Sequence, residues 1–113
     1  MIDRADRNIT ADLSLLDECK AAVQAVAPGA SLTLYGSRAR GDAREDSDYD
    51  LLILVDGPAD MDLERAIVDQ LVPLEVRTGQ VLTALVYSRA QWDSPAYRAM
   101  PLYKNVAREG VPI

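Results

Sequence analysis

The sequence predicts an α/β (α+β) fold, a small mixed β-sheet flanked by helices, within one domain spanning residues 1–113. Segments with helical spacing of apolar residues alternate with strand-like segments along the chain. One near-continuous apolar run, Tyr49 to Val55, is typical of a strand that is covered on both faces. With 49% hydrophobic and 27% charged residues, the composition is that of an ordinary globular protein.

In the first half of the chain, helical spacing predicts an amphipathic helix from about Ile9 to Val26, which Pro28-Gly29 ends. Ser31 to Tyr35 alternates like a strand and stops at a glycine. The polar segment from Arg38 to Ser47 is expected to be a short helix or loop. The buried strand over residues 49–55 follows it.

In the second half, apolar spacing predicts a helix from Asp60 to Val72. Leu74–Arg77 and Val81–Tyr87 are expected to be two strands joined through Thr78-Gly79-Gln80 as a hairpin. Ser-Pro then predicts the start of a last helix over residues 95–108, interrupted or kinked at Pro101.

Several classes of site are excluded by composition. The chain has no His and a single Cys, Cys19, which removes Ser-His-Asp and Cys-His nucleophiles, zinc fingers and intrachain disulfides. Any metal chemistry must use carboxylates and therefore hard ions such as Mg²⁺. A net charge of −6 argues against direct nucleic-acid binding.

No apolar run approaches the roughly 18 residues of a membrane span, so no membrane association is expected. The polar segment Met1–Asn8 lacks a signal-peptide core. A cytoplasmic location is the expectation.

Two acids at the start of the buried strand are the main candidates for chemistry. Asp48 and Asp50 are two residues apart, so both carboxylates are expected on one face of the strand, with Tyr49 on the other. Two adjacent carboxylates repel each other, and a bridging divalent cation is the usual reason to tolerate them.

A phosphate-binding turn is predicted ten residues before this pair. Gly36 permits a tight turn after a strand, and the turn's amides with the Ser37 hydroxyl are suited to holding a phosphate. Arg38 and Arg40 follow and offer positive charge for a polyphosphate, with only one of them expected to face it. A phosphate cradle beside a metal-binding pair is what nucleotidyl transfer needs.

Gly36-Ser37, ten residues and Asp48-Tyr49-Asp50 resemble the signature of the polymerase-β-like nucleotidyltransferase superfamily. Within it, residues 34–55 are similar to the minimal nucleotidyltransferase (MNT) domains, and residues 103–113 resemble the C-terminus of some of them. Some MNT proteins are antitoxins that transfer AMP from ATP to a tyrosine of a HEPN-domain ribonuclease toxin. The resemblance therefore implies the nucleotidyltransferase palm fold and a HEPN toxin as partner.

The resemblance also implies roles for single residues. Gly36 and Ser37 hold the triphosphate, with Arg38 and Arg40 at basic positions of the motif. Asp48 and Asp50 are the catalytic ligands of two Mg²⁺ ions. The superfamily usually has a third carboxylate on a later strand, but Val81–Tyr87 contains no acid, which leaves Glu75 on the preceding predicted strand as the nearest candidate.

Three functions remain open on the sequence. The first is an adenylyltransferase acting on the toxin protein. The second is a non-catalytic antitoxin that neutralises its toxin by binding, which the uncertain third acid favours. The third is a small-molecule nucleotidyltransferase of the aminoglycoside-modifying kind.

Overall fold

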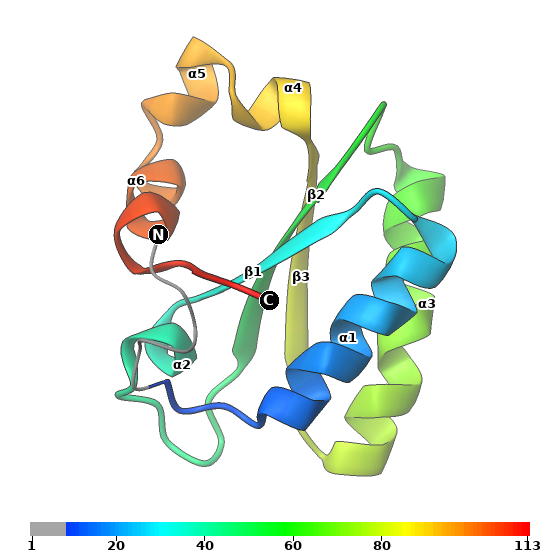
Figure 1. Cartoon of the computed structure of the whole chain (residues 1–113), viewed down its shortest axis with the longest axis vertical. Helices are drawn as coiled ribbons and strands as arrows, with labels where there is room; N and C mark the ends of the chain where they lie inside the picture. The colour runs from blue at the N-terminus through cyan, green and yellow to red at the C-terminus, as the bar shows by residue number, and fades with distance from the viewer. Residues whose placement is uncertain (1–8) are drawn as a thin grey trace.

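The computed structural model describes residues 9–113, which form a four-stranded sheet with helices on both faces (Figure 1). The strands lie in the order β3-β2-β1-β4. β1 (Ser31–Tyr35) is antiparallel to β2 (Tyr49–Val55) and to β4 (Val111–Pro112), whereas β3 (Leu82–Ser88) is parallel to β2. The predicted fold class is confirmed. The segment Met1–Asn8, considered above for a signal peptide, lies outside the described residues.

Helix α1 (Leu13–Val26) starts four residues later than the apolar spacing predicts. The reason is a cap: the Asp12 carboxylate accepts hydrogen bonds from the backbone N–H groups of Ser14 and Leu15. Its inward face, which includes the fully buried Cys19, packs on the sheet.

Helix α3 (Met61–Thr78) ends six residues later than expected, and it replaces the predicted strand over 74–77. Pro73 does not break the helix, because it lies on the exposed side while Leu71 is buried. The helix ends at Gly79, which has a positive φ of 72°. The predicted hairpin is therefore wrong: β3 follows a helix and pairs in parallel with β2.

The C-terminal region contains three short helices, α4 (Arg89–Trp92), α5 (Pro95–Arg98) and α6 (Pro101–Glu109). The single kinked helix expected over 95–108 is two helices, each with its proline in the first turn, because a proline lacks the N–H that would continue the preceding helix. The final strand β4 was not expected from the sequence.

The sheet separates two apolar clusters. α1 and α3 cover one face, called here the closed face, where Leu51 and Ile53 of β2 are fully buried with Ile67 of α3. The other face, called the open face, carries a smaller cluster in which Leu52 packs with Trp92 and Val106 beneath α4 and α6. Within residues 9–113, none of the helices combines the length and apolarity needed to cross a membrane.

Candidate functional site

Asp48 and Asp50 lie at the start of β2 on the open face. The strand alternates, so Tyr49 and Leu51 enter the closed-face cluster while Leu52 packs beneath α4 and α6, and Asp50 shares the side of Leu52. Burial raises the pKa of the Asp50 carboxyl, and the neighbouring Asp48 carboxylate raises it further. The two carboxylates are therefore close enough to repel, as the sequence predicts.

Both neighbouring strands carry a hydroxyl-bearing residue at the position opposite Asp50. In the ladder register, Asp50 is opposite Tyr35 of β1 and Thr83 of β3. The Thr83 hydroxyl lies 3.5 Å from the Asp48 carboxylate. Burial, with the Asp50 charge as a lesser cause, raises the pKa of Tyr35 to about 12, so this phenol stays neutral at physiological pH.

The turn at Gly36 touches the carboxylate pair directly. Gly36 has a φ of 76°, and a Cβ added there would collide with the Asp50 carboxylate. Helix α2 (Ser37–Arg40) starts at the next residue, and the Gly36 carbonyl accepts hydrogen bonds from the N–H groups of Ala39 and Arg40. Ser37 and Asp48, which have ten residues between them in sequence, are brought to one end of the sheet.

The two arginines of α2 have different surroundings. Arg38 is buried on the side away from the carboxylate pair, with its guanidinium 4.2 Å from the centre of the Tyr49 ring. It donates hydrogen bonds to the carbonyls of Thr10, Arg44, Glu45 and Ser47 and to the Gln80 side chain. Arg38 therefore braces the loop before Asp48, and the structure does not place it with the expected phosphate site.

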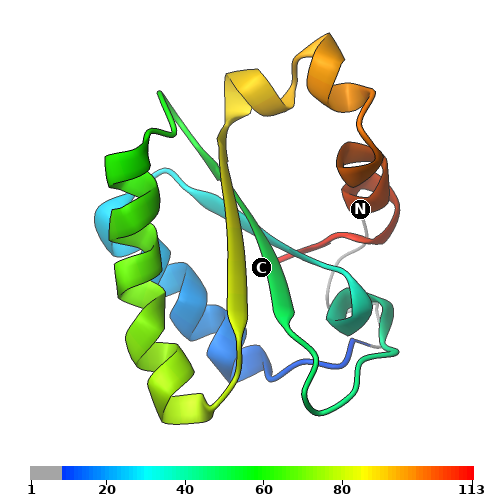
Figure 2. The ribbon, with the colours of Figure 1, turned by 180° about the vertical axis from the view of Figure 1, so that it is seen from behind.

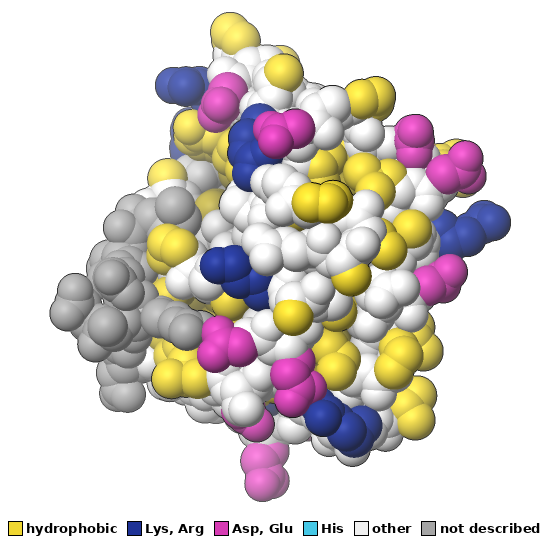
Figure 3. Space-filling view, turned by 45° about the vertical axis from the view of Figure 1, so that its right-hand side comes forward, with side chains coloured by type: hydrophobic (Ala, Val, Ile, Leu, Met, Phe, Trp, Pro, Cys, Tyr) yellow, Lys and Arg dark blue, Asp and Glu magenta, His cyan; other side chains and the backbone are white. Residues whose placement is uncertain are grey.

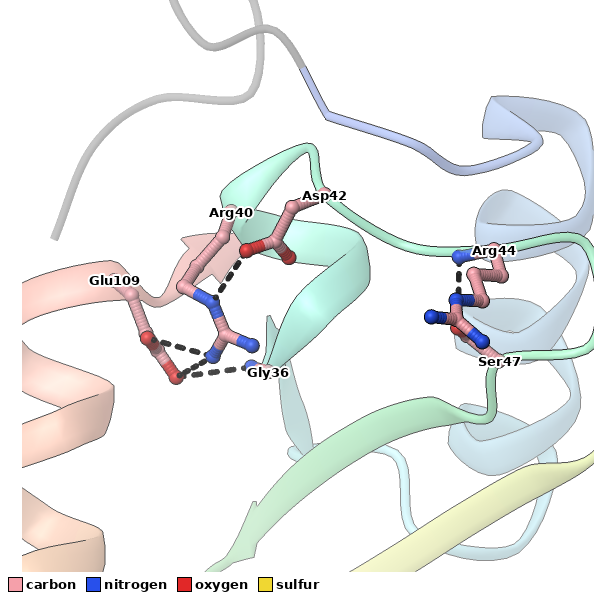
Figure 4. A network of polar contacts seen from close by, with 6 residues as sticks. All are labelled: Gly36, Arg40, Asp42, Arg44, Ser47 and Glu109. Carbon is pink, nitrogen blue, oxygen red and sulfur yellow. Dashed lines mark hydrogen bonds and ion pairs between the residues drawn. The ribbon is translucent and has the colours of Figure 1, made fainter.

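Arg40 remains at the site. Its half-exposed guanidinium pairs with Glu109 at 3.2 Å and with Asp42 at 3.3 Å (Figure 4). Its positive charge partly offsets the rise in the pKa of Asp50. In the same loop, the Ser47 hydroxyl accepts the Arg44 N–H at 2.9 Å and closes the turn that precedes Asp48.

Glu109, at the end of α6, belongs to the site but was missed by the sequence reasoning. Its buried carboxylate accepts the Gly36 N–H at 3.1 Å as well as the Arg40 guanidinium, and its charge raises the pKa of Asp50. The one signal in the sequence was the resemblance of residues 103–113 to the end of some MNT proteins. Glu109 thus ties the C-terminal helix to the glycine turn.

Glu75 is not brought to the carboxylate pair. It lies on α3 at the closed face, where its carboxylate accepts the Leu82 N–H at 2.9 Å and its charge adds to the raised pKa of Cys19. The strand position beside Asp50 is occupied by Thr83 instead. Within residues 9–113, no cluster of three or more acids or thiols is arranged to hold a metal ion.

The surface seen in Figure 3 carries Lys and Arg side chains scattered among Asp and Glu and among apolar groups. That face shows no basic stripe of the kind that follows a nucleic-acid backbone.

Comparison with known proteins identifies the region that contains these groups. A family model described as a nucleotidyltransferase domain matches residues 14–91, about two thirds of the chain. The match extends from α1 into α4, so it includes Gly36, both aspartates and Thr83, and it ends before Glu109. A search of curated proteins finds no match to this chain.

Proposed function

Because the chain belongs to the nucleotidyltransferase domain family, we propose that it transfers AMP from ATP to a hydroxyl group of a partner protein. The observation that carries this proposal is the contact of Gly36 with Asp50. A turn with room only for a glycine lies against one of two adjacent carboxylates, so phosphate and metal sites would share one corner of the sheet.

The triphosphate would be held by Ser37 and Arg40. The Gly36 N–H already donates to Glu109, so in this turn the group that binds phosphate would be Ser37. The Ser37 side chain has no hydrogen-bond partner within residues 9–113. Arg40 supplies positive charge next to Asp50. Charge-assisted hydrogen bonds of this kind are the strong ones in phosphate recognition.

Asp48 and Asp50 are a suitable donor set for Mg²⁺. The cation is usually bound by one or two carboxylates together with waters and substrate phosphates. Burial and then the charge of Asp48 raise the pKa of Asp50, and a bound cation would relieve the repulsion between the two carboxylates. When bound, Mg²⁺ polarises the α-phosphate and activates the acceptor hydroxyl. The third acid usual in the superfamily is replaced by the Thr83 hydroxyl, a weaker ligand.

In the proposed reaction, the acceptor oxygen forms a bond to the α-phosphorus of ATP. The bond from that phosphorus to the bridging oxygen of the β-phosphate breaks, pyrophosphate leaves, and the acceptor proton passes to solvent. Asp48 is exposed at the sheet end, so a hydroxyl on the surface of a folded protein has access to it. The resemblance of residues 34–55 to MNT domains makes a tyrosine of a HEPN toxin the acceptor we propose.

A second function, neutralisation by binding alone, is favoured by one observation. The register neighbour of Asp50 on β3 is Thr83 and not an acid, so a site with two carboxylates is a weaker catalyst than one with three. In this case the chain would keep the fold and use its net charge of −6 against a basic toxin surface.

One experiment distinguishes transfer of AMP from neutralisation by binding alone. The chain is incubated with α-³²P-ATP, Mg²⁺ and a helical protein that is encoded beside its gene and carries Arg-x₄-His, the motif that marks HEPN ribonucleases. Label in that protein is then measured. We expect label with the wild type, none with Asp48→Asn/Asp50→Asn, and wild-type label with Asp46→Asn, an exposed acid of the same loop. No label from the wild type, with toxin neutralisation unchanged in the double variant, would leave binding as the function.

A further inference from the structure

The buried carboxylate of Glu109 engages two donors of the kind that bind anions. Glu109 is the last residue of α6, which lies on the side of the sheet away from α1 and α3 and brings its C-terminal end close to α2 (Figure 2). The carboxylate accepts the Gly36 N–H at 3.1 Å and the Arg40 guanidinium at 3.2 Å (Figure 4). A guanidinium next to a main-chain N–H is suited to phosphate oxygens as well as to a carboxylate. An internal anion therefore occupies donors that a phosphate group would use.

The charges around Arg40 oppose a further anion. Arg40 pairs with Asp42 at 3.3 Å as well as with Glu109, so two carboxylates share one guanidinium. The Asp42 side chain is 62% exposed, whereas that of Glu109 is only 9% exposed. Water and salt screen an exposed charge strongly and a buried one much less. Of the two carboxylates, Glu109 is therefore the stronger competitor for Arg40.

The charge of Glu109 also reaches the carboxylate pair. Burial is the main cause of the raised pKa of Asp50 and the charge of Asp48 is the second, and Glu109 adds to the rise. The same negative charge repels a phosphate group that binds beside Asp50. Glu109 thus disfavours an anion at this corner of the sheet both by holding its donors and by repulsion.

We propose that Glu109 forms an autoinhibitory contact, and that its carboxylate must leave Gly36 and Arg40 before a polyphosphate binds there. The inference rests on the proposed function, which places the triphosphate of ATP at this turn. Release requires only rotation of the Glu109 side chain, so Val106 and Val111 on either side of it stay in the core. The affinity for ATP is then set by competition between the polyphosphate and Glu109.

Calorimetric titration of the full chain with inorganic tripolyphosphate and Mg²⁺ tests this competition without a transfer reaction. Glu109→Gln keeps an oxygen that accepts the Gly36 N–H but removes the charge. We expect this variant to bind tripolyphosphate roughly fivefold more tightly than the wild type or better, the lower end of the usual coupling between two sites. If Glu109 only supports the fold, the variant binds no more tightly than the wild type, and the proposal is overturned.

Asp42→Asn is the matched control, because it removes a carboxylate from the same guanidinium and leaves Glu109 in place. Its affinity for tripolyphosphate should rise much less than that of Glu109→Gln. An equal rise would mean that any negative charge lost near Arg40 has this effect, which contradicts a specific role of Glu109. Circular dichroism establishes that each variant is folded.

A double-mutant cycle separates displacement from repulsion. In the Arg40→Met background the guanidinium for which Glu109 competes is gone, so the gain in affinity from Glu109→Gln should become smaller. A gain of the same size in both backgrounds would show that Glu109 acts by repulsion alone, and it would refute displacement from Arg40.

Nuclear magnetic resonance of the wild type tests the release directly, even if Glu109→Gln does not fold. The carboxyl carbon of the Glu109 side chain is followed while tripolyphosphate and Mg²⁺ are added. Its signal should move toward that of an exposed glutamate with the same midpoint as binding. A signal that stays in place at saturation means that Glu109 keeps its partners, and the proposal fails.

The outcomes distinguish this inference from the proposed function. Wild type and Glu109→Gln that bind tripolyphosphate equally well refute the autoinhibitory contact and leave AMP transfer unaffected. Tighter binding by Glu109→Gln, with no label transferred to any acceptor, refutes AMP transfer and leaves the contact. Tripolyphosphate that binds to neither protein removes the phosphate site on which both rest.

Discussion

Strand β2 sends alternate side chains to two faces of the sheet that are covered to different extents. On the closed face, Leu51 and Ile53 have no exposed surface beneath α1 and α3. On the open face, Leu52 and Leu54 contact the C-terminal helices, but the strand begins with Asp48 and Asp50 at the molecular surface. One strand thus anchors the fold with half of its residues and presents charge with the others.

The largest expected effect is on the closed face. Leu51→Ala should lower the free energy of unfolding by about 2–5 kcal/mol, because it leaves a cavity in a fully packed region. Leu54→Ala on the partly exposed face should cost less. Urea unfolding monitored by circular dichroism measures both, and equal losses would mean that the two faces are equally important for stability.

Asp50→Asn should have the opposite effect to Leu51→Ala: it should lower activity and leave stability largely unchanged. Transfer of label should fall by on the order of 10²–10³, since the variant loses charge placed where the reaction develops its own, while the fold is retained. Initial rates of label transfer to the acceptor protein measure the activity, and the midpoint of unfolding measures the stability. A variant that loses its fold along with its activity would show that the charged end of β2 is also structural.

Arg38 and Arg40 allow the same comparison of a buried and an exposed position within one short helix, because they are only two residues apart. Arg38→Met should cost at least about 1.5–3 kcal/mol, the range for a single hydrogen bond to a charged group, because five acceptors lose their donor. Arg40→Met should cost less than Arg38→Met, because the Arg40 guanidinium is half-exposed, and it should weaken ATP binding instead. Denaturation curves with nucleotide titrations distinguish the two outcomes.

The pH dependence of stability should follow Asp50. Its pKa is raised on folding above the ordinary value of 3.8, so the folded protein binds this proton more tightly than the unfolded chain. The stabilising contribution of the proton is therefore present in acid and is lost as pH rises through the raised pKa.

The measurement compares wild type with Asp50→Asn in a chelator. Relative to the variant, the wild type should lose stability between acidic and neutral pH. If the difference in free energy of unfolding between the wild type and Asp50→Asn stays constant with pH, the pKa of Asp50 is not raised by folding.

The smallest effect is expected for Glu75→Gln. The amide oxygen still accepts the Leu82 N–H on the closed face, so both the unfolding midpoint and the rate of label transfer should stay near wild type. A rate loss comparable to that of Asp50→Asn would restore Glu75 as the third acid.

Local patterns were sufficient for much of this architecture. Strands β1 and β2 follow from alternation and a buried apolar run, and the meeting of Gly36 with Asp50 follows from a turn and a strand start in one motif. Residue type alone did not separate Arg38 from Arg40, because their places on α2 decide which one is buried.

Contacts distant in sequence were beyond such reasoning. Glu109 reaches Gly36 across 73 residues, and no local pattern relates them. The alternation in Leu74–Arg77 suggested a strand, but tertiary packing of Leu71 and the cap at Gly79 continue the helix through it.

The single cysteine of the chain reports on whether this packing is intact. The Cys19 thiol has no exposed surface, and burial, with the charges of Glu18 and Glu75 as lesser causes, raises its pKa to about 11. Only a thiolate in contact with solvent reacts quickly with an alkylating reagent. A pulse of such a reagent therefore labels molecules in which α1 has separated from the sheet, and each variant above can be ranked by labelling rate without an added probe.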